Sequence, residues 1–432
     1  KDCRPNTKMK HAGATKQGYE TKTVISWAFY DWANSAYATT VMAGFFPVFF
    51  KQYWSAGTDV HVSTFNLGTA NSLASVIVAL LAPVLGSIAD QWGNKKRFLL
   101  FFAVMGMVMT GSLGFVAKGE WLVAIFLYTF ANIGFTGGNV FYDSLMVCIV
   151  EKKKMDFVSA LGYSLGYLGG GILFAINVVM ALKPHLFGFP SAVEAIRISF
   201  FSVAVWWALF SVPIFLFVRE PKVRTAQSVT DAARSGMKQL FSTFREIRKL
   251  KHIFLFLVGY WCYIDGVDTT VIMAVDYGLS LGFDQTVLIK ALLITQFIGF
   301  PAAILFGKIG EKLGTRIGIF IGITVYVAVA IWGYYMNDPA EFYVLAIAVG
   351  LVQGGVQSLS RSLYGKMIPS ENAGEFFGFY NMLGKFAAVL GPFLMGITSL
   401  LTGNARCSIF AIIFLFVTGA FMLAFVKENS PR

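Results

Sequence analysis

The sequence predicts an all-α integral membrane protein with twelve transmembrane helices in two pseudo-symmetric six-helix bundles. Three observations predict this fold: the composition is too apolar for a soluble domain, long apolar runs recur along the chain, and two polar patterns repeat at one offset. Hydrophobic residues make up 56% of the 432 residues and charged residues only 13%, with a mean hydropathy of +0.65. A soluble protein of this size carries about 25% charged residues.

The apolar runs are long and continuous enough to be membrane helices. Each run, such as 99–117, approaches the roughly 20 residues that a helix needs to cross the hydrocarbon. Only helices and closed barrels satisfy their backbone groups in lipid, and apolar runs without alternation favour helices. We expect spans at approximately 24–50, 65–88, 98–117, 121–149, 158–182, 196–218, 253–275, 287–309, 317–336, 342–368, 376–401 and 406–426.

Positive charge is concentrated in alternate loops. One set of loops holds Lys95, Lys96 and Arg97, then Lys152 to Lys154, the segment from Arg219 to Lys251, and Lys308, Lys312 and Arg316. The other set carries little beyond Lys51, Lys118, Lys183, Arg197 and Arg406. The positive-inside rule then places both termini in the cytosol, which requires an even number of spans. The net charge of +12 therefore reflects membrane topology, and we expect no nucleic-acid partner.

The charge pattern also divides the chain into domains. We expect a cytosolic tail at 1–23, a first bundle at 24–218, a cytosolic linker at 219–252, a second bundle at 253–426 and a tail at 427–432. The first apolar run is a span and no signal peptide, because it is long, carries Asp31 and lacks a small-residue cleavage site. Met9 is a possible natural start, which leaves open whether Lys1 to Lys8 belong to the natural protein. Met237 to Lys251 fits either a basic amphipathic surface helix or a solvated linker.

Two polar patterns repeat at an offset of 221 residues. Gly86, Asp90 and Gly93 after span two recur as Gly307, Glu311 and Gly314 after span eight. The same offset relates a polar helix face in span four to one in span ten: Asn132, Thr136, Asn139 and Asp143 correspond to Gln353, Gln357, Ser360 and Tyr364. A less regular echo pairs residues 39–41 with 269–271, both Thr-Thr-Val. The repeats predict two related six-helix halves.

Ionisable residues inside the predicted spans mark the candidate coupling or gating site: Asp31, Asp143, Asp265, Asp268, Arg361 and Lys385. A charge near the bilayer centre costs about 2.5–3.5 kcal/mol, so such residues face a cavity or a partner. Three of them, Asp31, Asp143 and Arg361, lie at a similar depth of roughly 10–12 Å from the cytosolic end of their spans. This predicts either a charge network that opens and closes with protonation or a static ion pair.

Asp265 and Asp268 share one face of span seven with Thr269. Two carboxylates this close repel each other, so one of them should hold its proton more tightly. This suits a proton carrier. Hydroxyls and backbone carbonyls nearby would equally suit a sodium site. The third interpretation is that one of the two carboxylates lies at the wall of a wet cavity and has no role in coupling.

The segment Gly86 to Arg97 (GSIADQWGNKKR) resembles the signature loop of the major facilitator superfamily, although Asn94 delays the basic run by one position. The resemblance implies a latch that stabilises one gating state, made by Gly86, Asp90, Gly93, Lys95, Lys96 and Arg97. The alternative is that this segment is a turn that only fixes the membrane topology. Closer resemblance, to the vacuolar amino-acid effluxers of autophagy and their bacterial relatives, comes from the segments at 30–37, 141–143, 162–170, 353–364 and 375–380.

Resemblance to the superfamily places spans one, four, seven and ten around a central cavity. The implied substrate-binding candidates there are Trp32, Asn34, Tyr37, Asn139, Tyr142, Gln353 and Gln357. Amides and hydroxyls suit a zwitterion, and aromatic rings suit an apolar side chain. The same residue types also connect membrane helices to one another. The glycine-rich run from Gly162 to Gly171 predicts close helix packing and no nucleotide loop.

These patterns favour a secondary active transporter that moves a small polar metabolite, with an amino acid favoured, by alternating access. We expect symport or antiport with a proton or sodium ion, a monomer among membrane lipids, and a bacterial inner membrane. The alternatives are a passive channel or scramblase-like conductor and a transporter-like receptor without flux. The sequence shows no nucleophile–base pair, and its four cysteines (Cys3, Cys148, Cys262 and Cys407) lack paired spacing, so we expect no enzyme, cofactor or metal site.

Overall fold

The computed structural model describes residues 15–57, 76–91, 93–220, 238, 250–280, 282–403 and 405–427. The first span is a composite helix made of α1 (Thr15–Ala36), the π-helical η1 (Tyr37–Phe45), α2 (Phe46–Phe49) and η2 (Phe50–Trp54), and a helix at Val76–Gln91 follows it. The remaining long helices are α4 (Lys95–Leu113), α5 (Trp121–Ile149), α6 (Met155–Leu182), α7 (Ala192–Phe217), α9 (Lys251–Ser280), α10 (Gln285–Leu313), α11 (Thr315–Tyr335), α12 (Pro339–Met367), α13 (Ala373–Thr402) and α14 (Ile409–Ala424).

Within these described ranges, the helices follow the predicted order of spans and confirm the all-α membrane fold. Eight of them are long and apolar enough to cross a membrane by length and composition alone. Some helix boundaries differ from the prediction: α1 begins at Thr15 and not near residue 24, and α9 ends at Ser280 and not near residue 275. Most of the segment from Met237 to Lys251 lies outside the described residues, as does most of the linker at 219–252.

The chain turns tightly between consecutive helices because particular residues stand at the helix ends. Gly93 and Gly314, the paired glycines of the 221-residue repeat, both adopt a positive φ, of 65° and 102°. Only glycine adopts such angles at no steric cost. At the other end of the bundle, the side chain of Ser191 accepts a hydrogen bond from the Glu194 amide and caps α7. The repeat in the sequence therefore encodes two equivalent turns.

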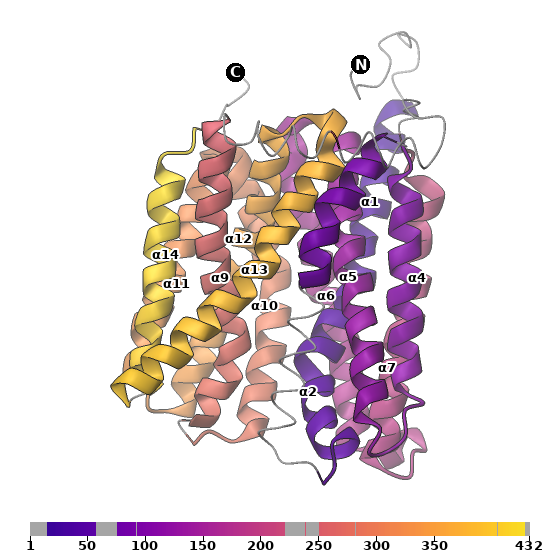
Figure 1. Cartoon of the computed structure of the whole chain (residues 1–432), viewed down its shortest axis with the longest axis vertical. Helices are drawn as coiled ribbons and strands as arrows, with labels where there is room; N and C mark the ends of the chain where they lie inside the picture. The colour runs from indigo at the N-terminus through magenta and orange to yellow at the C-terminus, as the bar shows by residue number, and fades with distance from the viewer. Residues whose placement is uncertain are drawn as a thin grey trace.

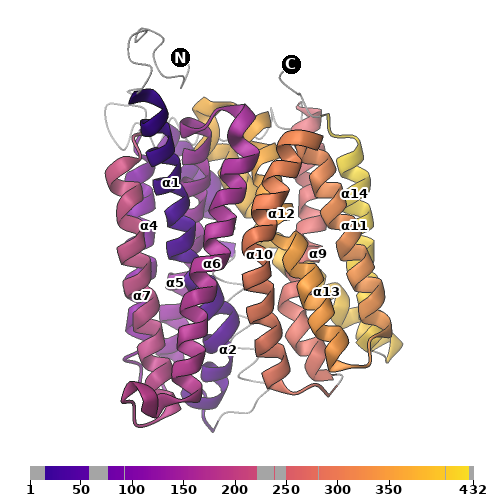
Figure 2. The same cartoon turned by 180° about the vertical axis from the view of Figure 1, so that it is seen from behind.

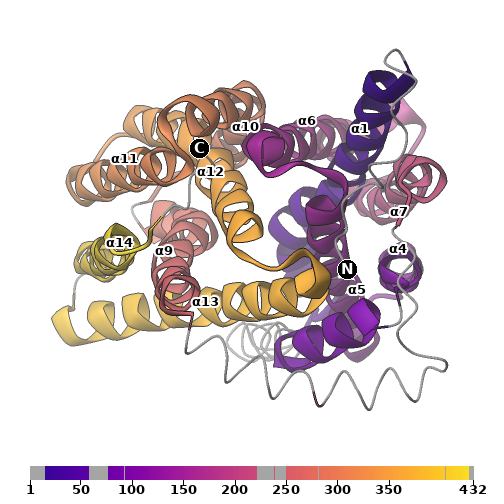
Figure 3. The ribbon, with the colours of Figure 1, turned by 90° about the horizontal axis from the view of Figure 1, so that it is seen from above.

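The helices form two groups that lie side by side (Figures 1 and 2). We call α1 to α7 the first half and α9 to α14 the second half. We call the end at which α1 begins and α14 ends, at the top of Figure 1, the upper end. Contact between the halves runs through α6, which packs on α10 and α12, and through α13, which packs on α5. The view from above shows α13 crossing from the second half toward α5 (Figure 3).

Glycines allow the closest helix contacts. In α6, a Cβ atom at Gly169 would lie 2.6 Å from the carbonyl oxygen of Trp32, and one at Gly166 would lie 2.6 Å from Ser35 Oγ. The glycine-rich run therefore packs α6 against α1, which confirms the packing interpretation of this segment. Gly307 of the second half likewise faces α6, where its Cβ would lie 2.6 Å from the Cβ of Ala160.

The substitution Gly169→Ala should destabilise the protein because the new methyl group meets backbone that cannot move aside. Overpacking of this kind costs about 1–3 kcal/mol. Gly333→Ala is the matched control, since its Cβ would find its nearest atom at an ordinary 3.7 Å. Thermal unfolding of the purified protein in detergent should show a lower midpoint for Gly169→Ala and an unchanged or higher one for Gly333→Ala, because alanine favours the helix where it meets no clash. Equal midpoints for both variants would contradict this account of the α1–α6 contact.

Candidate functional site: a buried charge network between the halves

Arg361 of α12 lies buried between the halves and binds two acidic residues of the first half. Its Nη1 lies 3.0 Å from Asp143 Oδ1, and its Nη2 lies 3.4 Å from Asp31 Oδ2. The remaining donors of the guanidinium reach α6, where Nε donates to Ser159 Oγ at 2.9 Å and Nη2 donates to the Ser159 carbonyl at 2.9 Å. The structure thus brings together the three charged residues that were predicted from their depth.

Further polar and aromatic groups hold the two carboxylates in place. Tyr142 OH donates to Asp31 Oδ2 at 2.8 Å, and the Asn381 amide donates to Asp143 Oδ2 at 3.3 Å. The Arg361 guanidinium lies 4.3 Å from the ring centre of Tyr163, within cation–π range. Asn381 and Tyr163 come from α13 and α6, so both halves contribute to the network (residues 31, 142, 143, 159, 163, 361 and 381).

At the upper end, Asp90 joins the first half to the start of α13. Its carboxylate accepts hydrogen bonds from the amides of Gly374 at 3.0 Å and Glu375 at 2.8 Å, and it pairs with Lys95 Nζ at 2.8 Å. A carboxylate at a helix N-terminus satisfies free amides and interacts favourably with the helix dipole. A Cβ at Gly86 would collide with the carbonyl of Gly374, so glycine is required for this contact.

The basic residues of the predicted latch have different surroundings. Lys96 Nζ donates to the carbonyls of Phe215 and Val218 at the end of α7, at 2.8 and 2.6 Å, and Arg97 is exposed. The amides of Lys95 and Lys96 donate to the Glu220 carboxylate. Burial raises the pKa of the Glu220 carboxyl above its ordinary value, and these two amides oppose the shift. Lys95 therefore joins the contact between the halves, whereas Lys96 stabilises the first half.

A second junction at the upper end mirrors the first. Asp156, in the first turn of α6, accepts hydrogen bonds from Thr315 Oγ1 at 3.0 Å and pairs with Lys366 Nζ at 2.6 Å. Ser362 also donates to it. Gly310 faces Asp156, where a Cβ would lie 3.1 Å from the carboxyl carbon. Both junctions thus combine an acidic residue of the first half with the start of a helix in the second half.

Sequence reasoning missed several of these residues: Trp27, Asp156, Ser159, Tyr163, Lys366 and Asn381. Asp156 follows directly on the basic loop and was expected to lie just outside span five. One available signal was its place directly after the basic loop, in the first turn of a helix. Trp27 stacks on Tyr142 with ring centres 4.4 Å apart and donates to the Tyr142 carbonyl at 2.9 Å. No motif marked that contact.

Four of the predicted substrate-binding residues lie at or just below the network. Tyr142 belongs to it, and Asn34 Nδ2 donates to Asn139 Oδ1 at 2.7 Å, about one turn deeper than Asp31 and Asp143. Gln357, one turn before Arg361, accepts a hydrogen bond from Tyr167 OH at 3.2 Å across the halves. These amides and hydroxyls form a polar path between the two halves.

The other three substrate-binding candidates lie elsewhere. Trp32 stacks on Trp206 at 5.7 Å, and the fully buried Tyr37 packs against Phe135 at 5.3 Å, both inside the first half. Gln353 lines a cavity of about 160 Å³ inside the second half, together with Thr269 and many apolar side chains. The predicted set therefore does not form one continuous site.

Asp265 and Asp268 differ in their surroundings. Asp265 is fully buried, and its Oδ1 accepts hydrogen bonds from the Gly391 amide at 2.9 Å and from Thr269 Oγ1 at 3.2 Å. Its Oδ2 is buried without a hydrogen-bond partner in the described part of the chain. Asp268 is half-buried and lies within electrostatic range of Tyr163 and other tyrosines. The side chain of Lys385 lies outside the described residues.

Comparison with solved structures identifies the fold. The structure of the human organic anion transporter MFSD10 aligns with a TM-score of 0.69 at 16% identity, covering 94% of this chain and 99% of that chain. The proton:xylose symporter XylE, a major facilitator superfamily protein, aligns with a TM-score of 0.69 at 12% identity, covering 96% of each chain. The two halves of this chain thus have the fold of these major facilitator structures.

Comparison with sequences identifies the family. The chain belongs to the family described as Vacuole effluxer Atg22 like, whose model matches residues 20–432. It is 39% identical to the MFS-type transporter YxiO of Bacillus subtilis over 412 residues, which cover 95% of this chain and 96% of YxiO. Autophagy-related protein 22 of Yarrowia lipolytica is 24% identical to this chain, and the alignment covers 85% of this chain and 76% of the Yarrowia protein. The predicted family resemblance is confirmed.

The stability of the protein should depend on charge balance within the network. Arg361→Gln leaves two buried carboxylates without their cation, and breaking a buried pair on one side costs about 3–5 kcal/mol. Adding Asp31→Asn and Asp143→Asn to Arg361→Gln should recover most of the loss, because all three groups are then neutral. Thermal unfolding of the purified variants tests this, with Lys118→Gln at an exposed lower-end site as the control. A triple variant as unstable as Arg361→Gln would contradict the electrostatic account.

Proposed function

We propose that this protein is a proton-coupled secondary transporter of a small polar metabolite, with an amino acid favoured, that works by alternating access. The observation that carries the proposal is the position of Arg361, which belongs to the second half and is bound by Asp31 and Asp143 of the first half. Opening of the upper end separates the halves and therefore breaks these ion pairs. Any event that changes their charge changes the free energy of opening.

The network has one cation for two carboxylates. With both carboxylates ionised it carries an excess negative charge in a buried place, where a charge without a partner is costly. A proton bound to either acid relieves this excess and weakens the attraction to Arg361. Proton binding and separation of the halves are thereby linked, which is the requirement for coupled transport.

The surroundings of Asp265 favour a proton over sodium as its partner. Its Oδ1 faces two donors, the Gly391 amide and the Thr269 hydroxyl. A sodium ion is bound by oxygen acceptors, and an amide N–H pointing into the site repels it. The buried Oδ2 is a position where a carboxyl proton can be carried. We therefore assign Asp265, with Asp31 and Asp143, to proton coupling.

The polar path below the network suits a zwitterionic substrate. Asn34, Asn139, Gln357 and Tyr167 supply amide and hydroxyl groups, which bind both a carboxylate and an ammonium. A phosphorylated substrate would need several buried basic residues, and Arg361 is already bound by two acids. The family description as vacuole effluxers supports a small-metabolite cargo.

We place the protein in a bacterial cytoplasmic membrane as a monomer with its upper end facing the cytosol. The 39% identity to a Bacillus subtilis protein supports the bacterial membrane. The basic residues of the upper end, such as Lys152 to Lys154, support the orientation through the positive-inside rule. Both junctions then close the cytosolic side in the conformation described here.

Transport by purified protein in liposomes tests the proposal. Uptake of radiolabelled amino acids, screened one by one, should be saturable and driven by an imposed pH gradient. Asp265→Asn and Asp31→Asn should each lower gradient-driven uptake at least about ten-fold, because the amide cannot bind and release a proton in the working range. Lys118→Gln should transport like the unmodified protein, since Lys118 is exposed at the lower end.

Other outcomes point to other functions. Uptake that ignores the gradient indicates a uniporter or another coupling ion, and flux that never saturates indicates a channel. Unchanged uptake per folded molecule in Arg361→Gln would reduce the network to a static ion pair. No flux of any amino acid from folded protein would reject the substrate class and leave the fold unaffected.

A further inference from the structure

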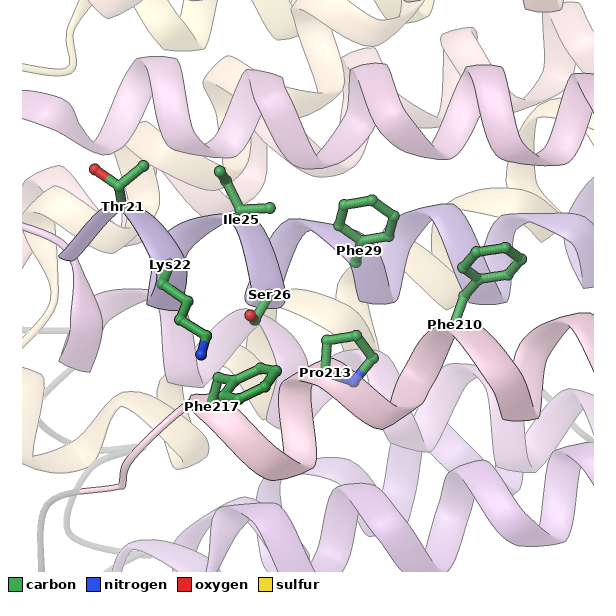
Figure 4. Close-up of a pocket in the computed structure, with 8 residues that line it drawn as sticks. All are labelled: Thr21, Lys22, Ile25, Ser26, Phe29, Phe210, Pro213 and Phe217. Atoms are coloured by element: carbon green, nitrogen blue, oxygen red, sulfur yellow. The ribbon is translucent and has the colours of Figure 1, made fainter. Parts of the chain in front are cut away.

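A groove of about 780 Å³ lies on the outer surface of the first half, between α1 and α7 near the upper end (Figure 4). It lies on a different face of α1 from Asp31, which pairs with Arg361. Its walls are formed by two helices that pack together further down. The lining residues are Thr21, Lys22, Ile25, Ser26, Phe29, Phe210, Pro213 and Phe217.

The groove is open above and closed below. At its deeper end Phe29 and Phe210 face each other with ring centres 6.4 Å apart, and Trp206 donates to the Trp32 carbonyl at 3.2 Å, which joins α7 to α1. Pro213 lies inside α7 and removes one intrahelical hydrogen bond in this region. The groove is thus a wedge-shaped space whose narrow end is aromatic.

Polarity changes along the length of the groove. Lys22, Thr21 and Ser26 lie at its upper mouth, and Figure 4 shows Lys22 and Phe217 facing each other from the two helices. Lys22 Nζ lies 3.7 Å from the centre of the Phe217 ring, in a cation–π contact that holds the ammonium at the mouth. Phe29 and Phe210 lie about 10 Å deeper, at 1.5 Å per helical residue. A cation and hydroxyls therefore sit above an apolar slot.

We propose that this groove binds one anionic phospholipid, with its phosphate at Lys22 and an acyl chain between Phe29 and Phe210. The groove faces the membrane, where an apolar slot is filled by a lipid chain because water is excluded. Charge selects among lipids, since a basic residue at the headgroup level attracts an anionic lipid. Thr21 adds a hydroxyl group next to Lys22 and Ser26 adds one about one helical turn deeper, and hydroxyl groups suit phosphate oxygens.

Native mass spectrometry of the full-length protein in detergent tests the site, with phosphatidylglycerol and phosphatidylcholine of identical acyl chains as probes. Phosphatidylglycerol should bind more tightly than phosphatidylcholine. Lys22→Gln should weaken phosphatidylglycerol binding about five-fold and leave phosphatidylcholine binding unchanged. Lys22→Arg should retain the preference, and Lys118→Gln, an exposed lysine at the lower end, should behave like the unmodified protein.

Three results would overturn the proposal. One is an unchanged lipid preference in Lys22→Gln, which would show that this groove does not select the headgroup. A second is equal binding of a short-chain phosphatidylglycerol, which would show that the apolar slot takes no part. The third is displacement of the lipid by inorganic phosphate at millimolar concentration, which would reveal a simple anion site. Lys22 is exposed, so its substitution should not impair folding.

Discussion

The absence of solvent for charges within a membrane is the constraint on which this structure depends. Arg361, Asp31 and Asp143 are buried among the helices, where a charge without a partner is costly, and each of them is paired within the protein. The partners come from opposite halves. These buried charges therefore join the two halves, and in the function that we propose their protonation weakens that contact.

The two junctions at the upper end extend this arrangement to the membrane surface. Asp90 caps α13, and Asp156 binds Thr315 and Lys366 at the starts and ends of helices in the second half. Each junction is accompanied by a glycine of the repeat, Gly86 or Gly307, that lets the halves approach. The internal repeat thus produces two similar contacts around one central network, and in the proposed alternating-access cycle all three separate when the upper end opens.

Much of the fold could be predicted because the features that encode it can be recognised along the sequence alone. Apolar length predicts spans, loop charge predicts their direction, and the 221-residue offset predicts the two halves. Depth along a helix also grouped Asp31, Asp143 and Arg361, since residues at one level can meet. Which neighbour a helix face meets is a three-dimensional property. Trp32 and Tyr37 lie near the polar face of the first span in sequence, yet they pack inside the first half.

The residues that sequence reasoning missed lie mostly at helix ends and in tight contacts. Asp156 stands beside a basic loop, and only the folded chain brings Lys366 to it. Ser159 and Asn381 are small polar residues of a common type, and their role follows from their contacts with Arg361 and Asp143. Asp265 was recognised as an ionisable residue inside a span, but the donors that face it became visible only in three dimensions.

The measurement that tests the central claim most directly is the distance across the upper end as a function of pH. Spin labels at positions 153 and 312, which are exposed on opposite halves, allow this distance to be measured by pulsed electron paramagnetic resonance. The labels are introduced into a variant whose native cysteines are replaced by serine. The account predicts longer distances at pH 5 than at pH 8, and long distances at both pH values when Asp31→Asn and Asp143→Asn are combined. A distance distribution unaffected by pH and by both substitutions would contradict it.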